Sequence, residues 1–329
     1  MPRLSFQLRT ISPLFLAGAD SQGEPELRAA SIRGQLRYWL RAVHGADVSG
    51  LDSVWKREAA VFGATDRGSV VSIRFTSDET IVPQNAPMLP HRLVTGKNPL
   101  KRRAIPRGTI CKLALVTRPG QALPDDFVKA LSTWLLLGGV GKRSRRTFGA
   151  FAIDDVDVTP GVRVDRANRW WATPPQTPDD LIKAIHAHFQ WLYPAGTTFA
   201  PVSGIPDYPT LHPQHSRIVV CKRRFASAQE ANQRLFNDLL RSNTHPYVQP
   251  QHKVMFGYAT AGRRASPVLA QVRQTGRAYA LILTAMRSPL KRSHELPATW
   301  QPDWTVVNQF LDEAETLFHG ETVWGGPFL

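Results

Sequence analysis

The feature that most constrains this chain is the order in which strand-like and helix-like hydrophobic patterns follow one another. Near the amino terminus, apolar residues alternate with polar ones, which is the period of a half-buried strand. Helices are predicted where apolar residues recur every three or four positions and a glycine follows. The predicted elements of this half are a strand at 4–8, a helix from Ser31 to about Val43, strands at 69–75 and 109–117, a helix from Pro124 to Gly138 and a strand at 148–153. This order predicts a ferredoxin-like βαββαβ unit, whose four antiparallel strands carry both helices on one face.

The second half of the chain repeats this order with little sequence identity between the copies. Between the halves, a proline-rich stretch contains one predicted helix, at 178–193. The predicted elements that follow are a strand at 217–225, a helix at 227–241, strands at 266–273 and 277–286, a helix at 303–318 and a short strand within 321–329. The sequence therefore predicts an α+β fold with two tandem ferredoxin-like domains, at 1–158 and 217–329, joined by a partly helical connector at 159–216.

Charge narrows the class of partner. Lysine and arginine outnumber the acids 41 to 26, which gives a net charge of +15. The excess is concentrated, because residues 91–146 contain thirteen Lys or Arg against only Asp125 and Asp126. A local basic field attracts polyanions, so nucleic acid is the first partner to consider and an anionic membrane a distant second. The long basic segment at 88–108, between two predicted strands, is predicted to be functional or disordered.

Several other classes of protein are not indicated. The chain has no apolar run long enough to span a bilayer and no signal-peptide core at its start, so a cytoplasmic location is predicted. Its two cysteines, Cys111 and Cys221, stand far apart in apolar runs, which indicates buried thiols and neither a disulfide framework nor a zinc site. No metal, cofactor or small-molecule substrate is predicted.

The strongest candidate site is the sequence GGVGKRSRRTFGAF, which follows the second predicted helix. Its glycines are expected to leave backbone N–H groups facing one concavity, where an anion can sit between flanking cations. It matches neither the Walker loop nor the dinucleotide fingerprint, so a backbone carrying many phosphates is predicted instead of one nucleotide. The alternative is a helix end followed by a solvated basic turn. The predicted RNA-binding residues here are Gly138, Gly139, Gly141, Lys142, Arg143, Ser144, Arg145, Arg146 and Phe148.

The first predicted helix offers a second set of cations. Arg33, Arg37 and Arg41 are spaced by four residues and so share one face, with no acid between them. Ser31 is predicted to cap this helix. We include Ser31 and the three arginines in the RNA-binding set, and we expect Trp39 to pack in the core.

These motifs together resemble a known family. The stretches ISPLFLAGAD, ELRAASIRGQLRYWLRAVHG, VFGATDRGSVV and GGVGKRSRRTFGAF, in this order, resemble the RAMP superfamily of CRISPR-associated proteins. Within it they are most similar to subunit one of the Cmr (type III-B) effector complex. YPTLHPQHSRIVV and RRASPVL in the second half resemble the same subunit. The resemblance covers most of the chain, and the connector matches less well.

The resemblance implies two ferredoxin-like domains and a place in a ribonucleoprotein, near the 3′ portion of a guide RNA and the target RNA paired with it. It assigns RNA contact to the glycine-rich basic loop, and the first-helix motif is matched by Ser31, Arg33, Gly34, Arg37 and Arg41. Target cleavage in such a complex is attributed to a different subunit, so the resemblance implies a non-catalytic binder. The second domain departs from the pattern because it ends without a basic glycine loop.

Two alternatives stay open at this stage. One is an endoribonuclease, for which Asp20, His44 and His91 are the candidate residues. Asp20 has no partner acid nearby for two-metal chemistry and is predicted to be a turn residue, and His44 is expected to interact with a helix end. The other alternative is a structural subunit whose basic surface contacts acidic protein partners.

Overall fold

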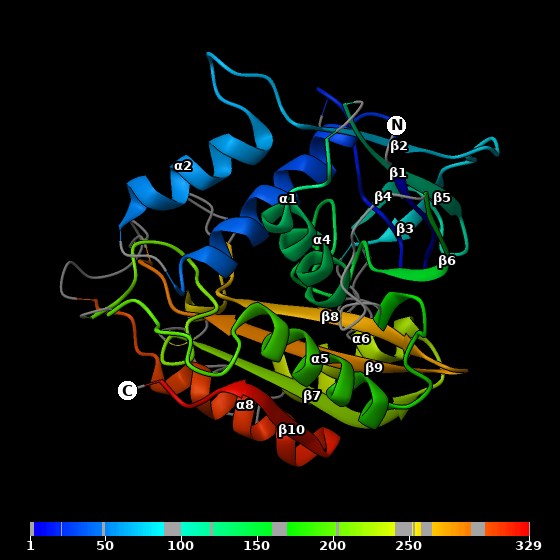
Figure 1. Cartoon of the computed structure of the whole chain (residues 1–329). Coiled ribbons are helices and arrows are strands. Elements are labelled where there is room, and N and C mark those ends of the chain that lie inside the picture. Colours follow the sequence, from blue (N-terminus) through cyan, green and yellow to red (C-terminus); the bar gives the residue numbers. More distant parts are fainter. Residues whose placement is uncertain are drawn as a thin grey trace.

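The structure is a computed structural model. It describes residues 3–20, 22–47, 50–88, 100–118, 121–159, 170–201, 204–240, 252, 254–257, 265–290 and 300–328. Two four-stranded antiparallel sheets dominate it (Figure 1). The first domain has strand order β2-β5-β1-β6 and the second has the equivalent order β10-β7-β9-β8. In each domain the chain passes through the strands as a βαββαβ unit, so the predicted pair of ferredoxin-like folds is confirmed.

In the first domain the central strand β1 pairs with β5 on one side and with β6 on the other. Its apolar residues point to the face that the helices cover, and its polar residues point away. The elements of this domain are β1 (Arg3–Thr10), α1 (Ala29–His44), α2 (Leu51–Phe62), β2 (Val71–Thr76), β3 (Gln84–Pro87), β4 (Lys101–Ala104), β5 (Ile110–Thr117), α4 (Asp125–Leu137) and β6 (Phe151–Val158). The first domain differs from the prediction in several elements. The helix α1 starts two residues before Ser31, β2 starts at Val71, and β6 runs from Phe151 to Val158. Neither α2 nor the pair β3 and β4 was predicted.

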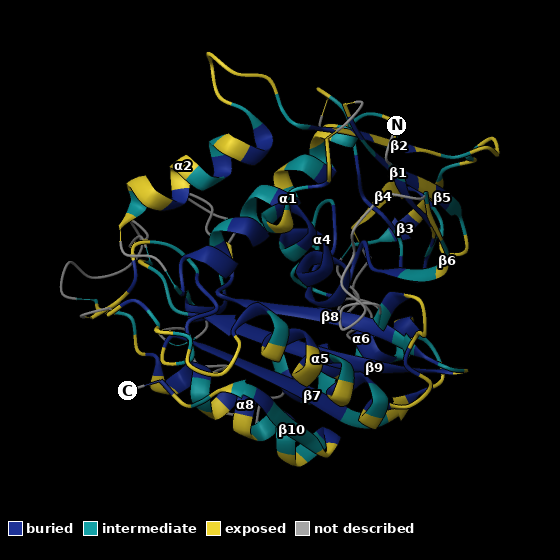
Figure 2. Ribbon diagram, in the orientation of Figure 1, coloured by how far each residue is buried: buried dark blue, intermediate teal, exposed yellow. Residues whose placement is uncertain are grey.

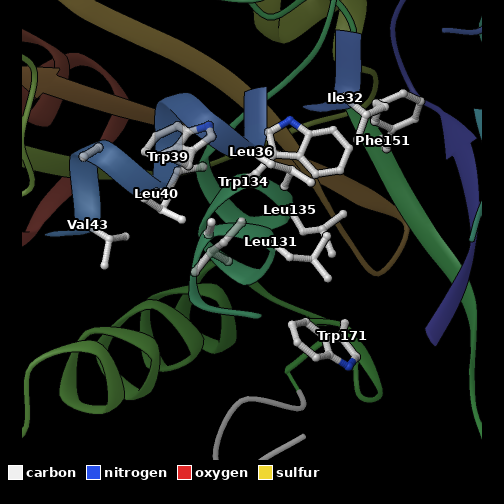
Figure 3. Packing of buried hydrophobic residues seen from close by; sticks show 14 of the residues in the cluster. Ile32, Leu36, Trp39, Leu40, Val43, Leu131, Trp134, Leu135, Phe151 and Trp171 are labelled. Atoms are coloured by element: carbon white, nitrogen blue, oxygen red, sulfur yellow. The ribbon is translucent and has the colours of Figure 1, made fainter. Parts of the chain in front are cut away.

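The core of the first domain forms where α1 packs on α4 over the sheet. Figure 3 shows Leu36, Trp39 and Leu40 of α1 facing Leu131 and Trp134 of α4. Trp39 is fully buried, as predicted. Spacing of three and four residues puts these side chains on one face of each helix, and their burial stabilises the pair by about 1.5–3 kcal/mol per large side chain.

A short ribbon is formed by residues on either side of 89–99 in the chain. Strands β3 and β4 form a two-stranded antiparallel ribbon, in which Gln84 pairs with Ala104 and Pro87 with Lys101. Residues 89–99, which include His91, lie outside the described part of the chain. The ribbon is attached to the first domain because Leu14 and Ile105 exchange backbone hydrogen bonds of 3.0 Å.

The second domain has both faces of its sheet covered. One face packs on α6 and α8, and the other packs on the connector helix α5 and on the first domain. Figure 2 shows β8, β9 and the first part of β7 largely buried. The elements are α5 (Pro178–Leu192), β7 (Ser216–Phe225), α6 (Ala228–Arg234) with a π-helical continuation at Leu235–Leu240, β8 (Val268–Thr275), β9 (Ala278–Met286), α8 (Thr305–Phe318) and β10 (Gly320–Gly325).

The connector helix α5 begins with a capping box, in which Thr177 and Asp180 satisfy each other's backbone N–H groups. It lies across β7 in Figure 1. Since β6 ends at Val158 and β7 begins at Ser216, we propose the domain boundaries predicted from the sequence, 1–158 and 217–329. Within the described ranges, no helix is both long enough and apolar enough to cross a membrane.

Candidate nucleic-acid interface

The segment 138–149, which we call the cationic loop, follows α4 and folds tightly against both domains. Gly149 has φ +64°, and a Cβ atom there would collide with the Val140 carbonyl. Gly141 has φ +88°, and a Cβ atom there would lie 2.6 Å from the Phe15 carbonyl oxygen. Residues with a side chain rarely adopt this left-handed backbone conformation, and neither position has room for a Cβ atom. The glycines therefore allow close packing of the backbone.

The expectation that these glycines leave amides free to bind an anion is wrong for seven amides of the loop, those of residues 138, 140, 142, 144, 146, 147 and 149. Val140 N donates to Gly149 O at 3.1 Å, and Lys142 N donates to Phe15 O at 2.8 Å. Ser144 N and Arg146 N donate to the carbonyls three residues before them, at 3.4 and 2.8 Å. Because these groups already have protein acceptors, a polyanion at the loop would be held mainly by side chains.

The carboxyl side of the cationic loop docks on the second domain. Thr147 N donates to Ala270 O at 2.8 Å, and Ala270 N donates to Arg145 O at 3.2 Å, so this segment pairs with the outer edge of β8. The Arg145 guanidinium donates to Ser266 O, and Arg146 donates to Phe256 O at 2.6 Å and to Val268 O at 3.2 Å. Pairing also covers a sheet edge that would otherwise expose unpaired backbone groups. Arg145 and Arg146 thus join the domains.

The buried side of this junction holds a third cation. Arg273 of β8 donates to Leu136 O at 2.9 Å and to Gly138 O at 2.6 Å, the carbonyls at the end of α4. Carbonyls at a helix carboxyl end carry partial negative charge, so they stabilise a cation. Burial lowers the pKa of the Arg273 guanidinium to about 9, and the group stays protonated at neutral pH.

Tyr38 of α1 brings the two predicted sets of cations together. The Arg145 guanidinium lies over the Tyr38 ring, 5.3 Å from its centroid, which is within the range of a cation–π contact. Burial raises the pKa of the Tyr38 hydroxyl, while the charges of Arg145 and Arg41 act in the opposite direction. The first-helix arginines and the cationic loop therefore form one continuous basic region.

The sequence showed no acid among the arginines of α1, but in the folded chain an acid from another helix reaches them. Glu58 of α2 accepts hydrogen bonds from Arg37 at 2.6 Å and from Arg41 at 3.0 Å, and it is 4% exposed. Arg33 donates to Phe62 O at 3.1 Å. These contacts clamp α2 onto α1. The side chains of Arg37 and Arg41 are nevertheless 43% and 38% exposed, so each keeps a surface toward solvent.

The structure places three further residues of the predicted motifs, Ser31, Gly34 and Phe148. Ser31 lies in the first turn of α1 and does not cap it, because the N-cap position is Arg28. Gly34 is exposed, with open space where a Cβ atom would lie. Phe148 is 5% exposed and packs edge-on against Phe15, with ring centroids 5.2 Å apart.

Of the three residues considered for nuclease chemistry, Asp20 and His44 have structural partners of their own, and His91 lies outside the described part of the chain. Asp20 accepts a hydrogen bond from Gln22 N at 2.8 Å, which makes it the turn residue that was predicted. His44 is fully buried, with Nε2 3.0 Å from an Asp126 carboxylate oxygen. Burial lowers the pKa of His44, but ion pairs with Asp126 and Asp47 outweigh this and raise it overall. Within the described ranges, no cluster of three His, Cys, Asp or Glu side chains could hold a metal ion.

Sequence reasoning missed Glu58, Gln271 and Arg273. Glu58 shares a helical face with Val54 and Val61, a pattern that would have indicated α2. Gln271 donates to Ser144 O. In the sequence of β8, Gln271 and Arg273 alternate with apolar residues, a pattern that usually marks the solvent-facing side of a strand, but both are buried here. No local signal shows that these polar groups meet the cationic loop and α4, which lie more than 120 residues away in sequence.

The sequence of this chain matches the model of one protein family. Residues 7–152 match the family model of the RAMP superfamily. This span runs from β1 to the start of β6 and includes the cationic loop and α1. The resemblance predicted from the sequence is therefore confirmed over this span, which is less than half of the chain.

The two relatives found by sequence are both named as subunits of the CRISPR Cmr system. Over 70 residues the chain is 37% identical to CRISPR system Cmr subunit Cmr1-2 of Pyrococcus furiosus, covering 21% of this chain and 37% of the relative. Over 163 residues it is 28% identical to Cmr1-1 of the same organism, covering 45% of this chain and 46% of the relative. The matched segments thus span less than half of either relative.

Solved structures extend the likeness to nearly the whole chain. The apo crystal structure of Cmr1 from Pyrococcus furiosus superimposes with a TM-score of 0.66 at 19% identity, covering 99% of each chain. A chain of the type III-B Cmr-beta complex bound to cognate target RNA also gives 0.66, at 10% identity over 96% of this chain and 99% of that one. At these identities the likeness shows a shared fold.

Proposed function

We propose that this chain is a non-catalytic RNA-binding subunit of a type III CRISPR RNA-guided effector complex of the Cmr kind. In this role it contacts the 3′ portion of the guide RNA, the target RNA paired with it, or both, in cytoplasmic antiviral defence. Its partners are those RNAs and the other subunits of the complex. The names of its relatives support the assignment, since both curated relatives are Cmr subunits and one structural relative was solved with target RNA.

The observation that carries the proposal is the basic region formed by the cationic loop and α1. Lys142, Arg143, Arg145 and Arg146 are all partly exposed. Arg41 and Arg145 both act on Tyr38, and Arg37 shares Glu58 with Arg41. Tight packing fixes the loop backbone, so these cations are positioned before RNA arrives. Such cations bind RNA by replacing counterions along the phosphate backbone.

The structure suggests different tasks for the two ends of the loop. Arg145 and Arg146 donate to carbonyls of the second domain, so their first task is to hold the domains together. Lys142 and Arg143 lie at the start of the loop's turn, farther along the chain from that docking. In the proposal, Lys142 and Arg143 supply the larger share of phosphate contact, and Arg145 and Arg146 also present their exposed edges.

The test replaces Lys142→Gln and Arg143→Asn together, since asparagine tolerates the left-handed backbone of Arg143, φ 59°. Affinity for single-stranded RNA should fall, and the slope of log affinity against log salt should weaken by about 1.4, because each lost phosphate contact removes about 0.7. Fluorescence anisotropy of the full chain with labelled RNA across a salt series measures both.

The matched control is Lys183→Gln with Arg74→Asn, which removes the same charge from exposed sites on α5 and β2. Equal losses in the two double variants would mean that only net charge matters and would contradict a site at the loop. Cleavage of the labelled RNA by the pure chain would contradict the non-catalytic part of the proposal.

A further inference from the structure

A cleft of about 580 Å³ lies between the two domains, beside the strand that leaves the cationic loop. Its walls come from the start of β6, the turn at Trp170, the connector at Pro174–Gln176, the end of β7 and the β8–β9 turn. Sites for small ligands have volumes of about 300–1,000 Å³ and often lie between domains. The cleft thus has the size and the place of a binding site.

The charge of this cleft is strongly positive. Four arginines line it, Arg9, Arg224, Arg273 and Arg277, against one acid, Asp154. Arg9 is occupied, because two of its nitrogens donate to the Asp154 carboxylate at 2.9 Å each. Arg273 is occupied by the α4 carbonyls described above. A cleft with apolar walls and a surplus of one charge focuses its field on ligands of the opposite charge.

The remaining two arginines have no assigned partner. Arg224 and Arg277 are exposed, and neither forms a hydrogen bond or an ion pair with any residue in the described part of the chain. Their neighbours differ in this respect. Lys222 pairs with Glu321 at 2.7 Å and with Asp179 at 3.2 Å, and Arg223 lies over the Phe225 ring. The cleft therefore holds the two cations of this region that the fold itself does not use.

An aromatic wall stands near these cations. Trp170 is half-buried at the cleft, and its Nε1 donates to Ser132 Oγ at 3.1 Å, which fixes the orientation of the indole. Phe151 and Leu135 continue the apolar lining. Base stacking on an aromatic side chain beside a cationic groove is the usual way in which proteins hold single-stranded nucleic acid without reading its sequence.

We propose that this cleft is a second contact site for single-stranded RNA, in which Arg224 and Arg277 bind phosphates and a base stacks on Trp170. The inference rests on the proposed RNA-binding function and adds a site outside the cationic loop and α1. A strand of RNA fits better than a free nucleotide, because the two open arginines are exposed at the rim, where a chain can enter and leave.

The experiment compares Arg224→Gln with Arg277→Gln, as one double variant of the full chain, against Arg223→Gln with Arg74→Gln. Both pairs remove two positive charges, but the second pair lies outside the cleft lining. With labelled single-stranded oligouridylate, the cleft variant should lose about tenfold in affinity, and its salt slope should weaken by about 1.4. Trp170→Leu should also lower affinity while leaving the slope unchanged, because stacking releases no counterions.

A second measurement does not depend on any variant. Oligouridylate containing 4-thiouridine, crosslinked to the wild-type chain, should label peptides that contain Trp170 or Arg277. Crosslinks found only outside the cleft would overturn the inference, as would equal affinity of the cleft variant and its control. Competition by uridine monophosphate as strong as that by the oligomer would assign the cleft to a free nucleotide and overturn it too.

These outcomes separate this inference from the proposed function. If the wild-type chain binds RNA and the variant of Lys142 and Arg143 weakens it, the function stands whatever the cleft variants do. If the cleft variants then match their control, only the cleft assignment fails. If the wild-type chain binds no RNA, alone or in its complex, the proposed function itself fails.

Discussion

At the scale of single residues, two buried arginines are held by defined partners. Arg217 of β7 is 3% exposed and pairs with Asp312 at 2.6 Å and Glu315 at 2.9 Å, both on α8. Arg273, equally buried, uses the carbonyls at the end of α4 in place of acids. Removing both acids would leave the buried charge of Arg217 without compensation, which costs several kcal/mol. Residues of this type therefore hold elements in place.

His188 gives a prediction at this scale. It is 1% exposed between Ser132 Oγ at 3.2 Å and Thr133 Oγ1 at 2.9 Å, and burial lowers its pKa to about 3. The unfolded chain binds a proton near pH 6.5 and the folded one does not, so stability is complete above that pH and is lost as pH falls toward 3. The free energy of unfolding should fall by up to about 1.4 kcal/mol per pH unit below pH 6.

The measurement is urea unfolding between pH 4 and pH 7. His188→Gln removes the titrating group, so this component of the slope should disappear even though the variant is less stable. His186→Gln, two residues away on the exposed side of α5, should keep the wild-type slope. A variant of His188 with an unchanged slope would contradict the assignment. The burial pattern puts His186 and His188 on different sides of α5.

At the scale of elements, α2 is attached to the first domain through few contacts. Its inner side is formed by the buried residues Val54, Val61 and Phe62. On the same side, Glu58 accepts hydrogen bonds from Arg37 and Arg41. In Figure 1, α2 stands away from the sheets and packs against α1. An element held in this way is expected to open locally more often than the sheets do.

Replacing Glu58→Gln should loosen this helix. The change removes the charge that two arginines share, and because those arginines are about two-fifths exposed, the cost is reduced by solvent screening to about 1 kcal/mol. Hydrogen exchange of the amides in Leu51–Phe62 should then become several-fold faster, while exchange in β1 and β5 stays the same. Asp52→Asn, on the exposed side of α2, is the control, and equal effects of both changes would show that Glu58 is not the clamp.

At the scale of the whole molecule, the two domains form one body through shared secondary structure. The cationic loop pairs with the edge of β8, α5 packs on α4 and on β7, and Arg9 of β1 donates to Gln274 of β8 at 3.2 Å. These contacts place the basic region and the cleft in fixed relation to each other. A long polyanion could therefore contact both domains without a rearrangement between them.

Arg273 tests this coupling. Arg273→Leu leaves Leu136 O and Gly138 O without their donor, so the interface should lose on the order of 2–4 kcal/mol. Calorimetry of the wild-type chain should show one transition, and the variant should show two as the domains uncouple. Arg277→Leu, on the exposed turn that follows β8, should melt like the wild type. A single transition at an unchanged temperature in the Arg273 variant would contradict this role.

The sequence by itself determined the order of the sheet strands and of the main helices, but neither α2 nor the β3–β4 ribbon. The alternation in β1 and β5, the helical spacing in α1 and α4 and the glycines at 138–149 are local features, so they predicted both ferredoxin-like folds. The same patterns identified the glycine-rich segment and the basic helix, and the superfamily match includes both. Periodicity encodes which face of an element is apolar, and that is enough to set the topology.

Only the tertiary structure decided what the polar side chains contact. Glu58 reaches Arg37 and Arg41, Arg146 reaches Phe256, and Arg273 reaches Gly138. Each contact joins segments that are far apart in the chain, and a cation has the same sequence signature whether it meets a carbonyl, an acid or water. Its partner depends on how the packed domains place the backbone, and for that reason the division between docking and exposed arginines emerged only in the folded molecule.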